Sequence, residues 1–236
     1  MSRKPPPFIN APLVTIVLAG IFVVVHLVVS QTGGALEVWA LTEGAVYPQR
    51  FWPWTGLVAD VPGVRPYSNM IEALMPTVTM ALLHADWGHV IMNSAMLLGV
   101  GKPVHEVIKR FIPPGGAPAL NADVRFLLLF LASVVGGSVF HLVSYYPYGP
   151  IAIGASGGVS GVLAAVLLTR TGAAGMILSV DFLKISAAFL IGNIVLALIG
   201  PGLLGASIAW QAHIGGYIAG AIVMKWMLHA GARHFE

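Results

Sequence analysis

The chain has 236 residues, of which 57% are hydrophobic and only 9% are charged. Soluble globular proteins carry about 25% charged residues, so this composition argues against a soluble enzyme and a disordered chain and predicts a polytopic membrane protein. The net charge of +3 leaves no basic patch for a nucleic-acid partner, and the lack of cysteine excludes disulfides and thiolate sites.

The apolar stretches of the chain predict six transmembrane helices, each of about 20 residues. The first is expected at about 11–30 and is too long and evenly apolar for a cleaved signal peptide. The others are expected at about 87–107, 124–144, 153–170, 182–200 and 207–228. The second span requires the long side chain of Lys102 to reach the membrane interface. We therefore predict an all-α fold, a bundle of six transmembrane helices that forms a single domain over residues 1–236.

A large external loop is expected between the first two spans, at about 32–86. It is rich in Trp, Tyr and Pro, and aromatic side chains favour the membrane interface. Its apolar segment at 73–85 is too short to cross the bilayer. Further along, residues 102–123 contain two prolines followed by two glycines, and they are predicted to form a short connecting loop.

The positions of Lys and Arg predict how the chain is oriented. With the N-terminus in the cytoplasm, ten of the 12 Lys and Arg residues lie on or near the cytoplasmic side, and only Arg50 and Arg65 lie outside. Because cytoplasmic loops are enriched in these residues, both termini are expected in the cytoplasm. The lack of cysteine and of targeting extensions fits a bacterial inner membrane.

Seven polar side chains within the predicted spans are candidates for a functional role, because contact of such groups with lipid is energetically unfavourable. They are His26, His89, Asn93, His141, Ser156, Asn193 and His213. Spans two, four and six run inward, and this places Ser156 and His213 at a similar depth, roughly 9 Å below the outer surface. His89 and Asn93 are four residues apart and share one helix face near the start of span two.

A serine close to a histidine is the minimum set for nucleophilic catalysis, because the imidazole can take the hydroxyl proton. Small residues at 154–161 surround Ser156, and Gly216 and Gly220 follow His213 on about the same helix face. Such residues let helix backbones approach closely, so span six can pack directly against span four. No carboxylate lies near enough in these spans to complete a triad, and we predict a Ser156–His213 dyad.

The polar residues outside the dyad are expected to have supporting roles. His89 and Asn93 are predicted to donate hydrogen bonds to a developing oxyanion. For Asn193, a hydrogen bond between helices is favoured over contact with a substrate. His26 and His141 are expected to pack within the bundle, and His84 is expected to organise the external loop.

Three motifs in this order resemble those of the rhomboid family of intramembrane serine proteases. The matching segments are His84-Ala-Asp-Trp-Gly-His89-Val-Ile-Met-Asn93, Gly154-Ala-Ser156-Gly157 and Ala212-His213-Ile-Gly-Gly216-Tyr-Ile-Ala-Gly220. The resemblance implies a water-filled site that opens outward, with Ser156 as nucleophile and His213 as general base. It implies oxyanion donors from His89, Asn93 and the Ser156 N–H. It also implies single-pass transmembrane proteins as substrates, which enter past span five and a loop at about 200–209.

One departure from the family pattern keeps an alternative open. Many rhomboids carry an aromatic residue one turn after the nucleophile that packs on the catalytic histidine, but this chain has Ser160 there, and Tyr217 is a second candidate for that packing. Ser160 is the one sequence feature that points to a rhomboid-like pseudoprotease, which binds transmembrane helices without cleaving them. Loss of either dyad residue would mark such a protein, and both Ser156 and His213 are present. A transporter or channel would show paired halves with broken helices or charge near the midplane, and no such halves occur. No histidine pair has the spacing of a metal site, so neither a metal nor a cofactor is expected.

Overall fold

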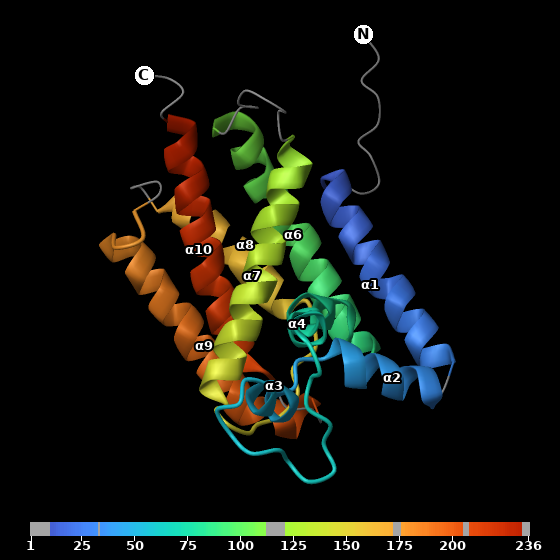
Figure 1. Cartoon of the computed structure of the whole chain (residues 1–236). Coiled ribbons are helices and arrows are strands. Elements are labelled where there is room, and N and C mark those ends of the chain that lie inside the picture. Colours follow the sequence, from blue (N-terminus) through green and yellow to red (C-terminus); the bar gives the residue numbers. More distant parts are fainter. Residues whose placement is uncertain (1–9, 33, 112–120, 172–175, 205–207, 233–236) are drawn as a thin grey trace.

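The computed structural model describes residues 10–32, 34–111, 121–171, 176–204 and 208–232. The regular secondary structure in these ranges is helical, apart from an isolated bridge between Val46 and Ala152. Six long helices form one bundle (Figure 1). They are α1 (Leu13–Gln31), α6 (Trp87–Phe111), α7 (Ala122–Ser144), α8 (Ser156–Arg170), α9 (Val180–Leu204) and α10 (Trp210–Ala232). The prediction of an all-α membrane bundle is confirmed.

The six helices differ in how well each would span a membrane alone. Helices α1 and α7 and the 180–200 part of α9 qualify by length and hydropathy. Helix α8 is apolar but has only 15 residues. It therefore rises about 22 Å, less than the roughly 30 Å of a hydrocarbon core. Most of α8 is buried among α6, α7 and α10, so its N-terminus lies inside the bundle.

Two helices end later than the sequence predicted. Helix α6 passes through Pro103 and ends at Phe111. The predicted connecting loop at 102–123 was therefore wrong over its first ten residues, and its double-proline segment lies outside the described residues. Helix α9 runs to Leu204 through Pro201, where a turn was expected. Proline removes one backbone N–H, but packed neighbours let a membrane helix continue past it.

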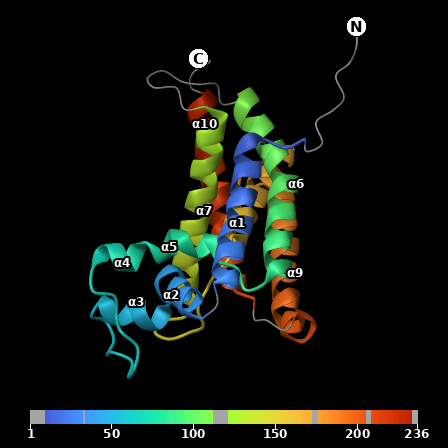
Figure 2. The same ribbon diagram turned by 90° about the vertical axis from the view of Figure 1, so that its right-hand side faces the viewer.

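The predicted external loop folds into short helices at the end of the bundle where α1 stops and α6 starts (Figures 1 and 2). These are α2 (Ala35–Gly44), α3 (Pro48–Trp54), α4 (Met70–Leu74), α5 (Pro76–Thr79) and the 3-10 helix η1 (Met80–Leu82). Because α10 begins at this end and α1 begins at the other, the loop lies on the side of the bundle that carries Ser156 and His213.

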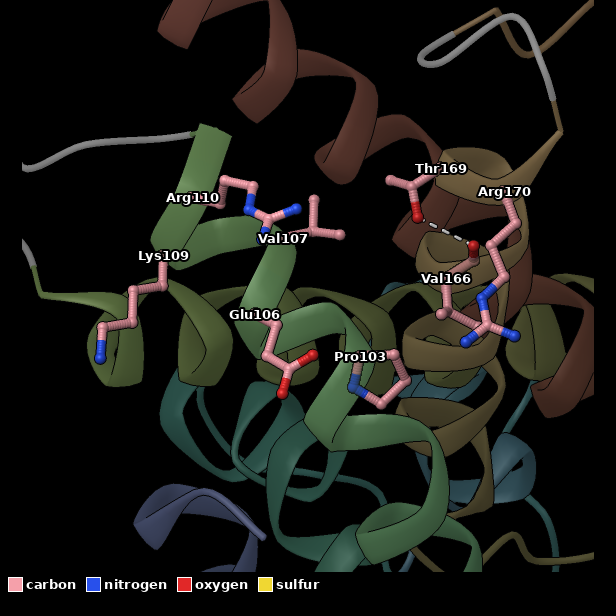
Figure 3. Close-up of a pocket in the computed structure, with 8 residues that line it drawn as sticks. All are labelled: Pro103, Glu106, Val107, Lys109, Arg110, Val166, Thr169 and Arg170. Carbon is pink, nitrogen blue, oxygen red and sulfur yellow. Dashed lines mark hydrogen bonds between the residues drawn. The ribbon is translucent and has the colours of Figure 1, made fainter. Parts of the chain in front are cut away.

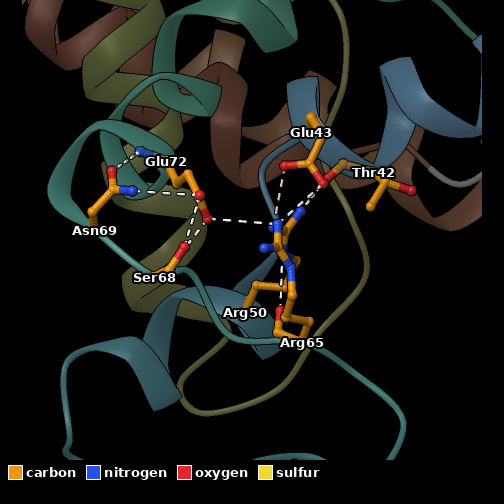
Figure 4. A network of polar contacts seen from close by, with 7 residues as sticks. All are labelled: Thr42, Glu43, Arg50, Arg65, Ser68, Asn69 and Glu72. Atoms are coloured by element: carbon orange, nitrogen blue, oxygen red, sulfur yellow. Dashed lines mark hydrogen bonds and ion pairs between the residues drawn. The ribbon is translucent and has the colours of Figure 1, made fainter.

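A buried arginine holds this loop together (Figure 4). Arg50 is only 3% exposed. Its guanidinium donates to the carbonyl oxygens of Thr42 and Arg65, forms an ion pair of 3.2 Å with Glu43 and lies 4.3 Å from the ring centre of Tyr67. A buried guanidinium needs such partners, because an unpaired charge would be strongly destabilising. The sequence separation of these groups shows that Arg50 fixes the path of the loop.

Arg65 and Glu72 extend the same network toward solvent. Arg65 lies 3.5 Å from Glu43 and 3.6 Å from Glu72. The hydroxyl and the backbone N–H of Ser68 donate to the Glu72 carboxylate, at 2.7 Å and 3.1 Å. These hydrogen bonds lower the pKa of Glu72, so its carboxylate stays ionised beside Arg65.

Helices α8 and α10 lie in unusually close contact. Gly157 and Gly161 on α8 face Gly216 and Gly220 on α10, and a Cβ on either glycine of α10 would clash with a backbone carbonyl of α8. Small residues at four-residue spacing allow this approach between membrane helices. The first turns of α8 and α10 are therefore held side by side.

Candidate active site

The N-terminal turns of α8 and α10 bring two side chains into hydrogen-bond contact. Ser156 is the first residue of α8, and His213 lies in the first turn of α10. The Nε2 atom of His213 is 2.8 Å from the Oγ atom of Ser156. The sequence predicted a similar depth for these residues, and the glycine contact between the two helices brings them within reach of each other.

Both residues line a cavity of about 290 Å³. Its walls come from α6, from the 151–153 segment, from α9 and from the start of α10. The lining residues are Ala85, Asp86, Gly88, His89, Met92, Ile151, Ile153, Ser156, Leu196, Ile208, Ala209 and His213. The cavity thus has mostly apolar walls and contains one hydroxyl–imidazole pair. Ligand sites are typically apolar pockets of this kind with a few placed polar groups.

His89 and Asn93 converge beside Gly154, two residues before Ser156. A Cβ on Gly154 would lie 2.7 Å from the His89 ring and 3.7 Å from Nδ2 of Asn93, and its φ of +113° also favours glycine. Asn93 is 3% exposed. Its Nδ2 atom has no hydrogen-bond partner in the described part of the chain. A buried donor without an acceptor costs about 1–3 kcal/mol, so this N–H group is available to donate to water or to a bound group.

The backbone just before Ser156 is held in an extended path. Ala152 exchanges two hydrogen bonds of 3.0 Å with Val46 of the external loop, and the N–H of Gly154 donates to the carbonyl of Met80 at 2.8 Å. No side chain caps the N-terminus of α8. The first N–H groups of a helix have no partner within the helix and favour negative charge. The start of α8 can therefore receive an anion.

Comparison with known proteins identifies the family. Residues 72–231 match the model of the rhomboid domain. The chain belongs to the rhomboid family. This rhomboid is also similar to the uncharacterized protein Rv1337 of Mycobacterium tuberculosis, with 31% identity over 189 residues that cover 76% of this chain and 68% of the relative. The uncharacterized protein Mb1372 of Mycobacterium bovis gives the same values. The family includes intramembrane serine proteases and also inactive members.

The surroundings of His213 in this rhomboid include a residue whose contact the sequence did not predict. Asn193 of α9 is 7% exposed, and its Oδ1 atom is 2.6 Å from Nδ1 of His213. The sequence indicated a hydrogen bond between helices for Asn193 but no particular partner. The one sequence feature that singled out Asn193 was a strongly polar side chain within an uncharged span.

The aromatic candidate Tyr217 contacts α9. Its ring stacks on Phe189 and Phe182, with ring centres 4.3 Å and 6.0 Å apart, and its hydroxyl is 2.9 Å from Oγ of Ser186. Ser160, which stands where many rhomboids have an aromatic residue, is buried within α8. The contact to the imidazole from α9 is therefore the one between Asn193 Oδ1 and His213 Nδ1.

The side chains of His26, His84 and His141 do not line the cavity that Ser156 and His213 share. The ring of His84 packs between His89 and Phe22, with ring centres 4.9 Å and 5.5 Å away. His26 contacts the ring of Trp87, and Nε2 of His141 is 2.9 Å from the carbonyl oxygen of Pro150. These contacts join α1, α7 and the segment before α8 to the rest of the bundle.

Proposed function

We propose that this rhomboid is a serine endopeptidase that hydrolyses peptide bonds of transmembrane proteins through Ser156 and His213. The observation that carries the proposal is the 2.8 Å contact between Ser156 Oγ and His213 Nε2 at the edge of an apolar cavity. The imidazole takes the hydroxyl proton while Oγ attacks the scissile carbonyl carbon. It then gives that proton to the leaving amine, and water hydrolyses the acyl-enzyme to regenerate Ser156.

The proposal assigns the developing oxyanion to His89, Asn93 and the backbone N–H of Ser156. Three features support it: the partnerless Nδ2 of Asn93, the uncapped start of α8 and the His89 ring beside Gly154. The N–H of Ala85 approaches Nδ1 of His89 at 3.5 Å, which favours the tautomer with a proton on Nε2. Donors fixed in place before reaction stabilise an oxyanion without reorganisation.

The proposal also covers the substrate and the setting of the enzyme. The apolar cavity and the surrounding bilayer suit a single-pass transmembrane protein as substrate. Helix α1 starts and α10 ends at the end of the bundle opposite the site (Figure 1). Lys109, Arg110, Arg125 and Arg170 lie in the terminal turns of α6, α7 and α8 at this same end. This distribution supports cytoplasmic termini. The mycobacterial relatives support a bacterial inner membrane, with residues 1–236 forming one membrane domain.

A cleavage assay with a covalent probe tests the function. The protein in liposomes should cleave a single-pass substrate that carries small residues near its outer membrane boundary. A fluorophosphonate should label the enzyme at a single site, and peptide mapping should identify it as Ser156. Labelling without cleavage would indicate a competent site offered the wrong substrate. A protein that neither cleaves nor reacts would support the pseudoprotease alternative.

A further inference from the structure

We propose that Asn193 positions His213, so that the activity of the Ser156–His213 pair depends on the position of α9 against α10. This inference rests on the proposed function and concerns the regulation of the same site.

The hydrogen bonds of Asn193 determine which nitrogen of His213 carries the proton. Its Nδ2 atom lies 2.9 Å from the carbonyl oxygen of Phe189. A carbonyl oxygen only accepts, so the amide NH₂ must face Phe189 and the amide oxygen must face His213. The amide oxygen also only accepts, so Nδ1 of His213 must donate. In a neutral imidazole Nε2 then has a free lone pair, which is what the hydroxyl of Ser156 requires.

Asn193 belongs to a narrow strip by which α9 contacts α10. Phe182, Ser186, Phe189 and Asn193 recur at intervals of four, three and four residues, which places them on one helix face. The first three contact Tyr217, one turn after His213, and Asn193 contacts His213 itself. One contact strip therefore sets both the position of α9 and the hydrogen bond to the imidazole.

Helix α9 is otherwise the least enclosed of the three helices that are long and apolar enough to cross a membrane alone. Only 11% of its most apolar stretch is buried, compared with 28% for α1 and 50% for α7. A helix with so little buried surface can shift at low cost compared with α8 or α10. A displacement of about 1 Å would break the contact between Asn193 and His213, and misplacement of this size costs on the order of 100-fold in rate. The position of α9 against α10 therefore controls the reactivity of Ser156.

Substitution of Asn193 tests the positioning role. Asn193→Leu keeps a similar volume but removes the acceptor, and we expect kcat to fall by about 100-fold while KM changes less than about threefold. Asn193→Asp retains an acceptor oxygen in either protonation state and should keep kcat within about tenfold of the parent. Asn121→Leu is the matched control, because Asn121 caps α7 at the other end of the bundle by accepting from Val124 N–H. It should lower the melting temperature without lowering kcat.

A second variant tests the dependence on α9. Phe189→Ala keeps Asn193 but removes the ring contact of α9 with Tyr217. We expect kcat to fall by about tenfold or more. Normal kcat in Asn193→Leu would overturn the positioning role, and normal kcat in Phe189→Ala would overturn the role of α9. A parent enzyme that lacks Ser156-dependent cleavage would instead refute the proposed function.

A second candidate site, lined by basic residues, lies at the opposite end of the bundle. A cavity of about 430 Å³ lies between the C-terminal turns of α6 and α8 (Figure 3). Arg110 of α6 and Arg170 of α8 line it from the two helices, and Lys109 is a third basic lining residue, whose side chain points away from Arg170 in this view. Its remaining lining residues are Pro103, Glu106, Val107, Val166 and Thr169.

The charges around this cavity do not cancel. Glu106 is its one acidic lining residue, and that carboxylate lies 3.9 Å from Lys102. None of the three lining cations forms an ion pair with the residues that the structure describes. The partial negative charges of the two helix ends offset only part of this excess.

The geometry points to a site for the phosphate of an anionic phospholipid headgroup. The cavity lies at the end of a membrane bundle, where headgroups are concentrated, and basic pockets between membrane helices bind such groups. A guanidinium group binds a phosphate through paired hydrogen bonds, and each of the two helices contributes one to the lining of the cavity. The apolar side chains of Pro103, Val107 and Val166 would lie against the glycerol and the first acyl carbons.

Native mass spectrometry in a neutral detergent tests this site. The parent should retain phosphatidylglycerol at least about fivefold more than phosphatidylcholine, and Arg110→Gln with Arg170→Gln should abolish that preference. Lys184→Gln with Lys225→Gln removes the same charge from α9 and α10, outside the cavity, and should preserve it. Equal losses in both double variants would show a general charge effect and overturn the site. Equal binding of inorganic phosphate, with no gain from the lipid, would overturn the lipid as its ligand.

Discussion

Replacing Ser156 with alanine should reduce substrate cleavage by about 1,000-fold or more, and replacing His213 with alanine should have an effect of similar size. The hydroxyl is the proposed nucleophile, and its 2.8 Å contact with Nε2 of His213 provides the base that activates it. Groups that act as a unit have strongly non-additive effects. The double variant should therefore lose little more activity than either single variant.

The measurement is initial cleavage rate in liposomes, with melting temperature as the check on folding. Ser160→Ala is the matched control, because it removes a hydroxyl from the same face of α8 one turn further on. It should keep activity within about threefold. Cleavage by Ser156→Ala within tenfold of the parent would contradict the mechanism, provided that the variant melts like the parent.

The sequence predicts the bundle well because lipid imposes simple rules. A long apolar run must form a helix that satisfies its own backbone groups, so the six long helices follow from composition and charge alone. The ends of these helices are harder to predict. The second span was expected to end near residue 107 and the fifth near residue 200, but α6 runs to Phe111 and α9 runs to Leu204, because a local pattern does not show how the rest of the fold lets a helix continue.

The candidate site was predicted in part for a similar reason. Depth along a span follows from counting residues, so the sequence alone places Ser156 and His213 at the same level. Rotation of one helix against another cannot be counted in this way. The contact of Asn193 with His213 and the burial of Arg50 depend on such rotations and on residues far apart in sequence. The catalytic and oxyanion roles themselves stay predictions until substitutions are measured.

Substituting Gly220 should damage stability and activity together, although it lies two turns from His213. A Cβ at this position would meet the carbonyl oxygen and Cα of Gly161, and backbone atoms cannot rotate away as a side chain could. We expect Gly220→Ala to destabilise the protein by about 3 kcal/mol, at the upper end of overpacking effects. Gly220→Val should have a larger effect and prevent accumulation of folded protein.

The activity loss in Gly220→Ala should exceed what the unfolded fraction explains. Ser156 belongs to α8 and His213 to α10, so any outward shift of α10 lengthens the 2.8 Å contact between them. Gly99→Ala on α6 is the matched control, because no atom lies within 4 Å of the added Cβ. Alanine is favoured over glycine in a helix by up to about 1 kcal/mol, so this variant should melt at the same or a higher temperature. Equal melting curves and equal rates for the two variants would show that α8 and α10 are not in the close contact described. If melting temperature and cleavage rate fall only in Gly220→Ala, the distance between Ser156 and His213 depends on the glycine contact between α8 and α10.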